Sequence, residues 1–288
     1  MNKVKKRLPI TLFLTVILLT ITTTSHTQNF TFEDIVKKNT IKYEQWTVNT
    51  YMKLKHKAEK DLWDKPYQNA RWFTDKFWPD RDNEKFIESQ LKTYLFPTDA
   101  WEDYLFSTIS VVELEVDKMA KDILIEANII KSNDDVVVNV PIGVKGLFTQ
   151  GLPTADDIVK SIYSKLEAEG ANTVPEYQIQ KAWERYVARY PKTTLTLSAF
   201  TALAAGLLTK NPYVGVGTFA VLGGIHVRIH EKKEKYHATL IGAITENKDR
   251  FNNTLKQLIF KTLEGTQLYF KNQGVVHVKQ QGSTYPKP

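Results

Sequence analysis

The amino-acid sequence predicts a mainly α-helical fold: a helical bundle with a central apolar helical hairpin and a small two-stranded β element. Three observations support this class. Apolar residues recur at intervals of three and four over long stretches, which is the spacing of one helix face. Two short stretches, 136–140 and 274–278, are the expected strands, and the chain of 288 residues has no cysteine. Disulfide scaffolds, cysteine-ligated metal sites and thiol nucleophiles are therefore excluded.

The N-terminus has the pattern of a secretory signal peptide. Four basic residues lie within the first seven positions and precede an uncharged apolar stretch at 8–21, as in the basic and hydrophobic regions of an export signal. We therefore expect residues 1–27 to be a signal peptide that is cleaved on export, with an uncleaved membrane anchor as the alternative. Residues 28–288 are then expected to form a single domain in a periplasmic or secreted protein.

The net charge of +7 is distributed unevenly along the chain. Removal of residues 1–27 takes away four basic residues and leaves a net charge of 35 − 32 = +3. Residues 28–193 then have 23 basic and 27 acidic residues, whereas residues 194–288 have 12 basic and 5 acidic ones. This pattern disfavours nucleic acid as a partner. It favours an anionic lipid surface or an acidic protein partner for the C-terminal third, with an ordinary solvated surface as the alternative.

The first helical stretch begins at a capping-box sequence. Thr31 and Asp34 have the spacing at which two residues cap each other's backbone, and a lysine-rich amphipathic stretch follows to about Lys60. An aromatic cluster then spans residues 62–79, interrupted by two prolines. Large rings in a cluster predict a buried core, with a carbohydrate- or lipid-binding surface as the alternative. The rings are Trp63, Tyr67, Trp72, Phe73, Phe77 and Trp78.

The clearest helix is expected from Asp99, a candidate N-cap with Glu102 three residues later, to about Ile130. Its apolar stripe keeps the helical spacing throughout. The stripe consists of Leu105, Ile109, Val112, Val116, Met119, Ile123, Ala127 and Ile130. The β-branched run at 136–140 then predicts a short strand. Residues 274–278 are its expected partner.

Three further helices are expected in the C-terminal half. Thr154 and Asp157 are candidate caps of a helix at about 155–169, and a second helix is expected at 176–190. A last long helix is expected from about 231 to 270. Its expected buried face consists of Ile241, Ile244, Phe251, Leu255 and Leu258.

The stretch from 193 to 227 has one charged residue, Lys210. Two uncharged runs of 17 residues, 193–209 and 211–227, are separated by a turn sequence, and 17 residues is about the shortest helix that crosses a bilayer. The sequence therefore predicts an apolar hairpin, either buried in the bundle or inserted into a membrane, conditionally or constitutively. Basic flanks on both sides disfavour stable insertion of an exported chain. Its apolar and small residues include Leu195, Phe200, Leu203, Gly206, Leu207, Phe219, Leu222 and Gly224.

Half of the six histidines lie close together after the hairpin. His226, His230 and His237 share one helix face with Glu234, and a His-x-x-x-His spacing suits zinc or another transition metal. The full metalloprotease motif is absent because Val227 follows His226. We expect a solvated basic helix without a cofactor, with a divalent-metal site as the weaker alternative.

No nucleophile-elbow, phosphate-loop or dinucleotide-binding motif occurs in the sequence. We therefore expect an exported, non-enzymatic envelope or secreted binding protein that associates with a membrane surface through residues 193–235. A helical pore-forming or membrane-perturbing effector that uses the same hairpin is the alternative. A metal-binding protein that uses the histidine face is a weaker one. The sequence leaves the oligomeric state open.

Overall fold

The computed structural model describes residues 31–132, 136–138, 140–170, 189, 212–272 and 278–280. This part of the chain is mainly helical, as the sequence predicts. The signal peptide at 1–27, the helix at 176–190 apart from Arg189, and the uncharged run at 193–209 lie outside the described residues. The elements are α1 (Phe32–Lys38), α2 (Thr40–Ala58), the π-helical turn η1 (Glu59–Trp63), α3 (Asp64–Phe77), the 3-10 turn η2 (Trp78–Asp80), α4 (Glu84–Tyr94), α5 (Thr98–Glu126), β1 (Val136–Val138), α6 (Val144–Gly151), α7 (Ala155–Gly170), α10 (Pro212–Asn272) and β2 (Val278–Gln280).

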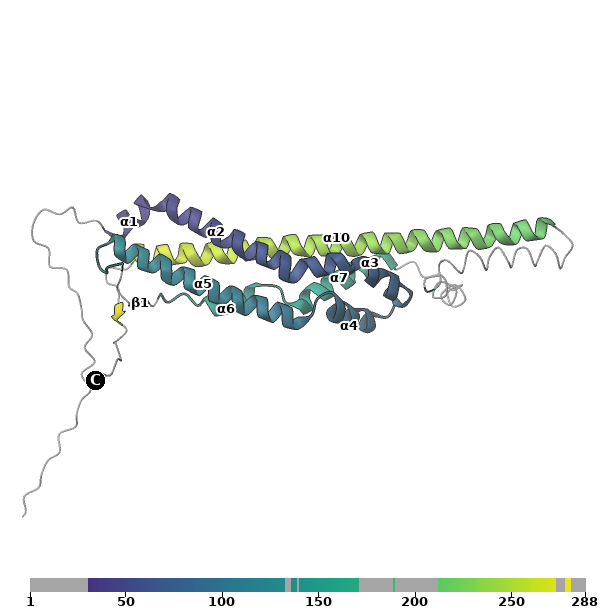
Figure 1. Cartoon of the computed structure of the whole chain (residues 1–288), viewed down its shortest axis with the longest axis horizontal. Coiled ribbons are helices and arrows are strands. Elements are labelled where there is room, and N and C mark those ends of the chain that lie inside the picture. Colours follow the sequence, from purple (N-terminus) through teal and green to yellow (C-terminus); the bar gives the residue numbers. More distant parts are fainter. Residues whose placement is uncertain are drawn as a thin grey trace, which may run out of the picture.

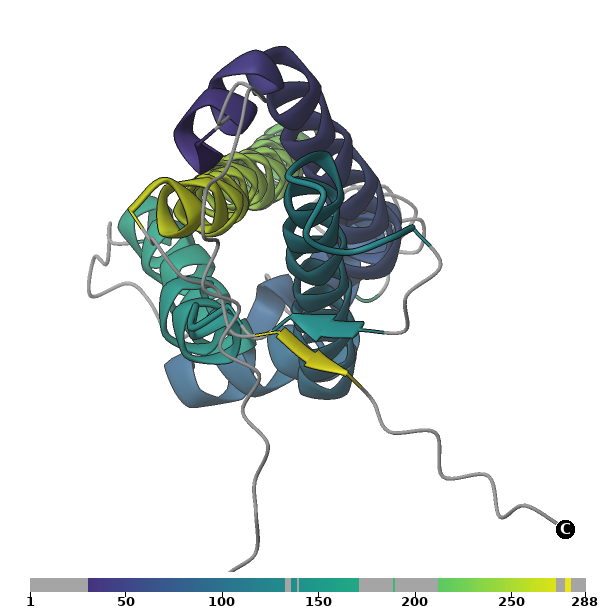
Figure 2. The same cartoon turned by 90° about the vertical axis from the view of Figure 1, so that its left-hand side faces the viewer.

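The bundle is organised around α10, which packs against α1, α2, α3, α5, α6 and α7. Figure 1 shows the helices running along one long axis, and Figure 2 shows them end-on, side by side around that axis. Among the side chains of α10 that the structure describes, the buried ones lie between Tyr236 and Phe270. The N-terminal part of α10 extends past the ends of α3, α4 and α7 (Figure 1).

The expected division between a hairpin arm at 211–227 and a separate helix from 231 is wrong. Both stretches belong to α10, a single helix of 61 residues, which is about 90 Å long at a rise of 1.5 Å per residue. The composition changes at Arg228 from uncharged to charged, but no glycine or proline occurs between Gly224 and Gly242. A change of polarity alone does not end a helix, because backbone hydrogen bonding continues through it.

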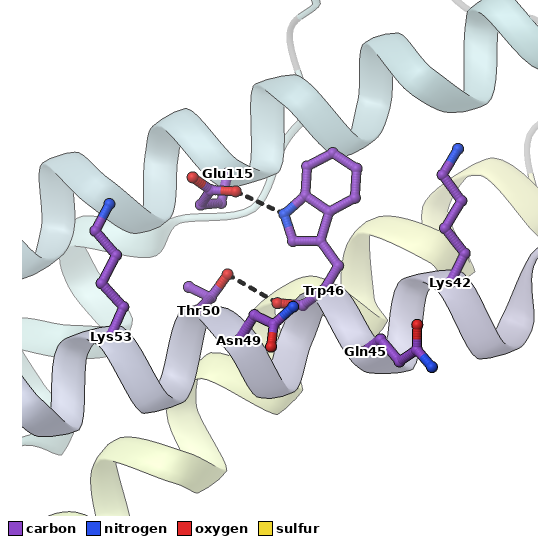
Figure 3. A pocket seen from close by; sticks show the side chains of 7 residues that line it. All are labelled: Lys42, Gln45, Trp46, Asn49, Thr50, Lys53 and Glu115. Atoms are coloured by element: carbon purple, nitrogen blue, oxygen red, sulfur yellow. Dashed lines mark hydrogen bonds between the residues drawn. The ribbon is translucent and has the colours of Figure 1, made fainter.

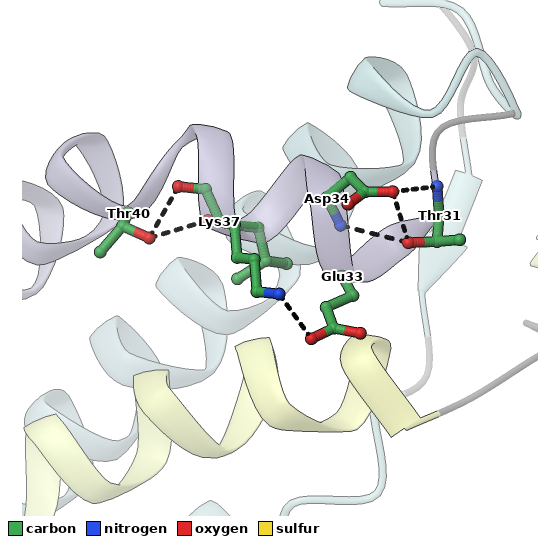
Figure 4. Close-up of polar contacts among 6 residues, drawn as sticks. Thr31, Glu33, Asp34, Lys37 and Thr40 are labelled. Atoms are coloured by element: carbon green, nitrogen blue, oxygen red, sulfur yellow. Dashed lines mark hydrogen bonds and ion pairs between the residues drawn. The ribbon is translucent and has the colours of Figure 1, made fainter. Parts of the chain in front are cut away.

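The first helical stretch is divided in two, which corrects the expectation of one helix to Lys60. The predicted capping box is present: Asp34 N donates to Thr31 Oγ1 over 3.3 Å, and Thr31 N donates to Asp34 Oδ2 over 3.1 Å (Figure 4). The break occurs at Asn39, whose φ of −101° and ψ of 14° are not helical. Thr40 Oγ1 donates across the break to the carbonyl oxygens of Val36 and Lys37.

The prolines of the aromatic cluster act differently from each other. Pro66 lies inside α3 and does not end it, because the wider turn η1 precedes it, with Asp64 N donating to the carbonyl oxygen of Glu59. A π-helical turn relieves the clash that a proline ring makes with the preceding turn. Pro79 does mark an end, since it lies in η2 after the last residue of α3.

Helix α5 has 29 residues and confirms the strongest helix prediction. It begins at Thr98, with Pro97 as an N-cap that makes no side-chain bond, so Asp99 is not the cap that the sequence suggested. An extended φ/ψ at Pro97 is enough to start the helix there. The helix ends before Asn128, whose φ of 56° lies in the left-handed region that asparagine tolerates better than most residues.

Two short strands lie at one end of the bundle (Figure 2). β1 and β2 pair antiparallel, with Val136 opposite Gln280 and Val138 opposite Val278. The expected partner range, 274–278, shares only Val278 with β2. Both Val136 and Val138 are buried, so that β1 is packed on the bundle.

The core is rich in aromatic rings. Trp63 is fully buried and makes edge-to-face contacts with Phe96, Trp101 and Phe251 at centroid distances of 6.1, 5.6 and 5.9 Å. Edge-to-face pairs add to the burial of the rings themselves. The prediction of a buried aromatic cluster is confirmed for Trp63, Phe73, Phe77 and Trp78, but Trp72 is 43% exposed.

Candidate functional site

The first candidate region is an ionic junction between α3 and α10, which we call the α3–α10 junction and which consists of Arg71, Asp75, Lys233 and Glu234. Arg71 Nη1 donates to Glu234 Oε2 over 2.7 Å, and Lys233 Nζ lies 2.8 Å from Asp75 Oδ1. The Nε atom of Arg71 lies 3.4 Å from Asp75 Oδ1. The hydrogen bond from Arg71 lowers the pKa of Glu234, so this carboxyl group stays charged to a lower pH than usual.

The junction contains one of the residues that the sequence suggested as metal ligands, and two others lie beside it. His230 Nδ1 is 3.9 Å from Glu234 Oε1, whereas His237 Nδ1 lies 3.3 Å from Thr74 Oγ1. The structure thus brings His230 near Glu234 and turns His237 to α3, and the side chain of His226 lies outside the description. Within the described residues, no group of three or more histidine, cysteine, aspartate or glutamate residues is placed to hold a metal ion.

The second candidate region is an aromatic cage around a lysine. We call Trp72, Phe77 and Tyr94 the aromatic cage. The ammonium of Lys76 lies 4.7 Å from the ring centroid of Trp72, 5.2 Å from that of Phe77 and 5.1 Å from that of Tyr94. All three distances are within the range of cation–π attraction. The cage is on the surface, because Trp72 and Lys76 are exposed and Tyr94 is half-buried.

The cage and the junction lie at the same end of the bundle. Both use residues from the last two turns of α3, and Tyr94 adds the C-terminal end of α4. Figure 1 shows α3 and α4 at the end from which the N-terminal part of α10 extends. This end therefore combines an exposed tryptophan, an ionic network and the C-terminal end of the second uncharged run, 211–227.

The third candidate region is a groove of about 410 Å³ on the outer side of α2 (Figure 3). Trp46 Nε1 donates to Glu115 Oε2 over 2.6 Å, which fixes the indole ring between α2 and α5. Lys42 and Lys53 lie at the two ends of the groove (Figure 3). Its amides, hydroxyl and ammonium groups are the kind that bind a polar or anionic ligand. The lining residues are Lys42, Gln45, Trp46, Asn49, Thr50, Lys53 and Glu115.

A second groove, of about 400 Å³, lies where the loop between α6 and α7 meets α10. It contains Asp157, which accepts hydrogen bonds from Thr154 N over 2.9 Å and from Thr154 Oγ1 over 2.7 Å. These bonds lower the pKa of Asp157. They also confirm the predicted capping of α7, so the acidic group here has a structural role.

The eight hairpin residues singled out from the sequence fall into two groups. Leu195, Phe200, Leu203, Gly206 and Leu207 lie outside the described residues. The other three, Phe219, Leu222 and Gly224, lie in the extended part of α10, where only the backbone is described. Among the helices that the structure describes, none is long and apolar enough to cross a membrane.

Sequence reasoning missed the cage and the groove on α2. The spacing of four between Trp72 and Lys76 signals an aromatic–cation pair on one helix face, but Tyr94 comes from another helix. Likewise, Trp46 and Glu115 are 69 positions apart. Comparison with known proteins adds no assignment, because no protein family, curated protein or solved structure matches this chain.

Proposed function

We propose that the chain is a non-enzymatic exported protein that binds a membrane surface through residues 193–235. The observation that supports this most directly is the continuity of α10. One helix joins the second uncharged run to the bundle, and its N-terminal part extends past the neighbouring helices (Figure 1). An uncharged segment at the end of a rigid helix can meet a lipid surface without unfolding the bundle.

The charges next to this segment fit the same function. Arg228, Lys232 and Lys235 follow the uncharged run within eight positions. Clustered basic residues beside an apolar segment are attracted to anionic headgroups, by about 1 kcal/mol for each residue near the surface. Lys233 contributes less to such binding, because its side chain is 12% exposed and is paired with Asp75.

The test is co-sedimentation of the mature protein with vesicles that contain phosphatidylglycerol. Leu203→Lys places a charge in the middle of the first run, and Leu268→Lys is the matched control on an exposed position of α10 in the bundle. We expect unchanged melting for both variants and lost vesicle binding only for Leu203→Lys. Unchanged binding of Leu203→Lys contradicts the proposal. So does failure of that variant to fold, since it would place the run in the packed core.

A second candidate function is a membrane-perturbing effector, favoured by the equal length of the two uncharged runs, 193–209 and 211–227. Two matched apolar segments joined by a turn are the minimum for a hairpin that enters a bilayer. Release of a trapped dye from the same vesicles distinguishes the two functions. Binding without release supports a surface-binding protein, whereas release at sub-micromolar protein supports the effector.

A further inference from the structure

We propose that the aromatic cage of Trp72, Phe77 and Tyr94 is a binding site for the trimethylammonium end of a phosphocholine group, and that Lys76 fills this site in the free protein. The site itself is independent of residues 193–235. Only the choice of a lipid as the source of phosphocholine rests on the proposed function.

The geometry is that of a cage for a cation. The rings come from two helices and contact one another, with centroid distances of 5.8 Å between Trp72 and Phe77, 5.1 Å between Trp72 and Tyr94, and 5.6 Å between Phe77 and Tyr94. The Lys76 ammonium is within 5.2 Å of each centroid. Aromatic cages of this kind recognise quaternary ammonium ligands.

Phe77 anchors the cage to the bundle. Its ring is 5% exposed and packs on Phe73 and Phe86 at centroid distances of 4.8 and 5.9 Å. The outer wall is Trp72, which is 43% exposed. The cage is thus rigid on its inner side and open on its outer side, as an exchangeable ligand requires.

Lys76 is a replaceable occupant. Among the residues that the structure describes, no carboxylate is paired with its ammonium, so the three rings are its contacts. A primary ammonium is strongly hydrated, and it gives up part of that hydration inside the cage. A trimethylammonium group has the same charge and offers methyl groups to the ring faces. Replacement of the Lys76 ammonium by a trimethylammonium group in the cage is therefore favourable.

The displaced lysine has a second role in the complex. A phosphocholine group has a phosphate a few bonds from its trimethylammonium, and Lys76 remains tethered at the mouth of the cage through its flexible side chain. Once released, its ammonium can pair with that phosphate, because ammonium–phosphate pairs are strong charge-assisted contacts. The same lysine thus closes the free site and contributes to the occupied one.

The first experiment titrates tetramethylammonium ion onto the full chain by calorimetry. Lys76→Ala vacates the cage, so we expect it to bind the ion at least about fivefold more tightly than the wild type. Trp72→Ala combined with Lys76→Ala is expected to abolish binding, and Lys53→Ala, in the groove on α2, to match the wild type. Circular dichroism checks that each variant is folded. The proposal is overturned if Lys76→Ala binds the ion no more tightly than the wild type. It is also overturned if Trp72→Ala combined with Lys76→Ala binds the ion as tightly as Lys76→Ala alone.

The second experiment compares soluble phosphocholine with phosphatidylcholine vesicles. We expect the wild type to bind phosphocholine more tightly than tetramethylammonium, and Lys76→Ala to lose that difference; a difference that persists in Lys76→Ala contradicts the phosphate contact. Trp72→Ala is expected to weaken binding to phosphatidylcholine vesicles. If vesicles bind but neither the wild type nor any variant binds tetramethylammonium or soluble phosphocholine, the cage proposal fails and the proposed function stands. If both soluble ligands bind but phosphatidylcholine vesicles do not, the cage stands and a lipid is not the source of its phosphocholine, whereas the membrane-surface function is tested separately by the phosphatidylglycerol vesicles.

Discussion

Buried tyrosine hydroxyls in the bundle differ in whether they have a partner. Tyr104 Oη donates to the carbonyl oxygen of Leu54 over 3.0 Å, and Tyr43 Oη donates to Asp122 Oδ2 over 3.0 Å. Within the described residues, the hydroxyl of Tyr236 has no hydrogen-bond partner, although its side chain is buried. A buried polar group without a partner destabilises a fold, whereas a paired one is roughly neutral or favourable.

This contrast predicts opposite effects for two otherwise identical substitutions. Tyr104→Phe removes a made hydrogen bond and should lower the free energy of unfolding by about 1 kcal/mol. Tyr236→Phe removes an unpaired hydroxyl and should leave that free energy unchanged or raise it. Urea unfolding followed by circular dichroism measures both. A loss in Tyr236→Phe as large as that in Tyr104→Phe would show that the Tyr236 hydroxyl is bonded.

The same tyrosines predict how stability depends on alkaline pH. Burial raises the pKa of Tyr43, Tyr104 and Tyr236 above the ordinary value of about 10. Above pH 10 the unfolded chain therefore loses these protons while the folded chain keeps them, so the stability that is present below pH 10 declines as pH rises. Each group contributes up to about 1.4 kcal/mol per pH unit. Urea midpoints between pH 9 and 11.5 measure the decline, and Tyr104→Phe should make it shallower. A midpoint that stays constant over this range contradicts the expectation.

At the scale of elements, two helical glycines have different surroundings. A Cβ at Gly242, in the middle of α10, would meet no atom within 4 Å, whereas a Cβ at Gly151, the last residue of α6, would lie 2.9 Å from Leu258 Cδ2. Glycine in a helix interior is about 1 kcal/mol less favourable than alanine. Of these two glycines, only Gly242 can be replaced by alanine without displacing a neighbouring side chain.

We therefore expect Gly242→Ala to raise the free energy of unfolding by about 1 kcal/mol. Gly151→Ala should bring no gain, because the side chain of Leu258 has to move and the position is at a helix end. Thermal melting of both variants under the same conditions is the measurement. Similar increases in melting temperature would mean that the contact between α6 and α10 is looser than described.

How far the sequence predicts an element depends on how local its determinants are. The helix α7 is predicted with its caps because Thr154 and Asp157 are three positions apart, and α5 because its apolar stripe is regular. The passage of α3 through Pro66 is not predictable in this way, since it depends on the preceding π-helical turn. The sequence did not predict the continuity of α10 because its polarity changes at Arg228. The helical backbone continues through that change.

The candidate sites show the same limit more strongly. Sequence reasoning identified His230, Glu234 and His237 as neighbours on one face, which the periodicity of a helix guarantees. It could not supply Arg71, which binds Glu234 from another helix and lowers the pKa of its carboxyl group. Likewise the aromatic stretch was recognised, but whether Trp72 faces the core or the solvent depends on where α4 packs.

At the scale of the whole molecule, the α3–α10 junction is expected to be a weak point compared with the aromatic core. Its charged side chains other than Lys233 are 40–47% exposed, and exposed ion pairs contribute about 0–1 kcal/mol. Glu234→Gln should therefore lower global stability by less than about 1 kcal/mol. It should nevertheless increase amide hydrogen exchange in α10 near residues 230–237 several-fold, because opening there is local.

Exchange measured by mass spectrometry tests this, with Glu246→Gln as the matched control. Glu246 lies further along α10 and is paired with Lys165 on α7. We expect its substitution to leave exchange at 230–237 unchanged. Equal exchange in both variants and the wild type would indicate that packing, rather than the ionic contacts, joins α10 to α3 at this end.

The unbroken length of α10 also makes it a lever arm. From Lys233 to Pro212 the helix runs for about 32 Å, so a tilt of about 5° at the pivot displaces its tip by about 3 Å. A torque on the tip is transmitted back along the helix to the pairs Arg71–Glu234 and Asp75–Lys233, which are the ion pairs nearest to the tip among those that the structure describes between α10 and other helices. The same mechanical link runs in the other direction, so that loosening these two pairs would change the angle at which the tip is presented.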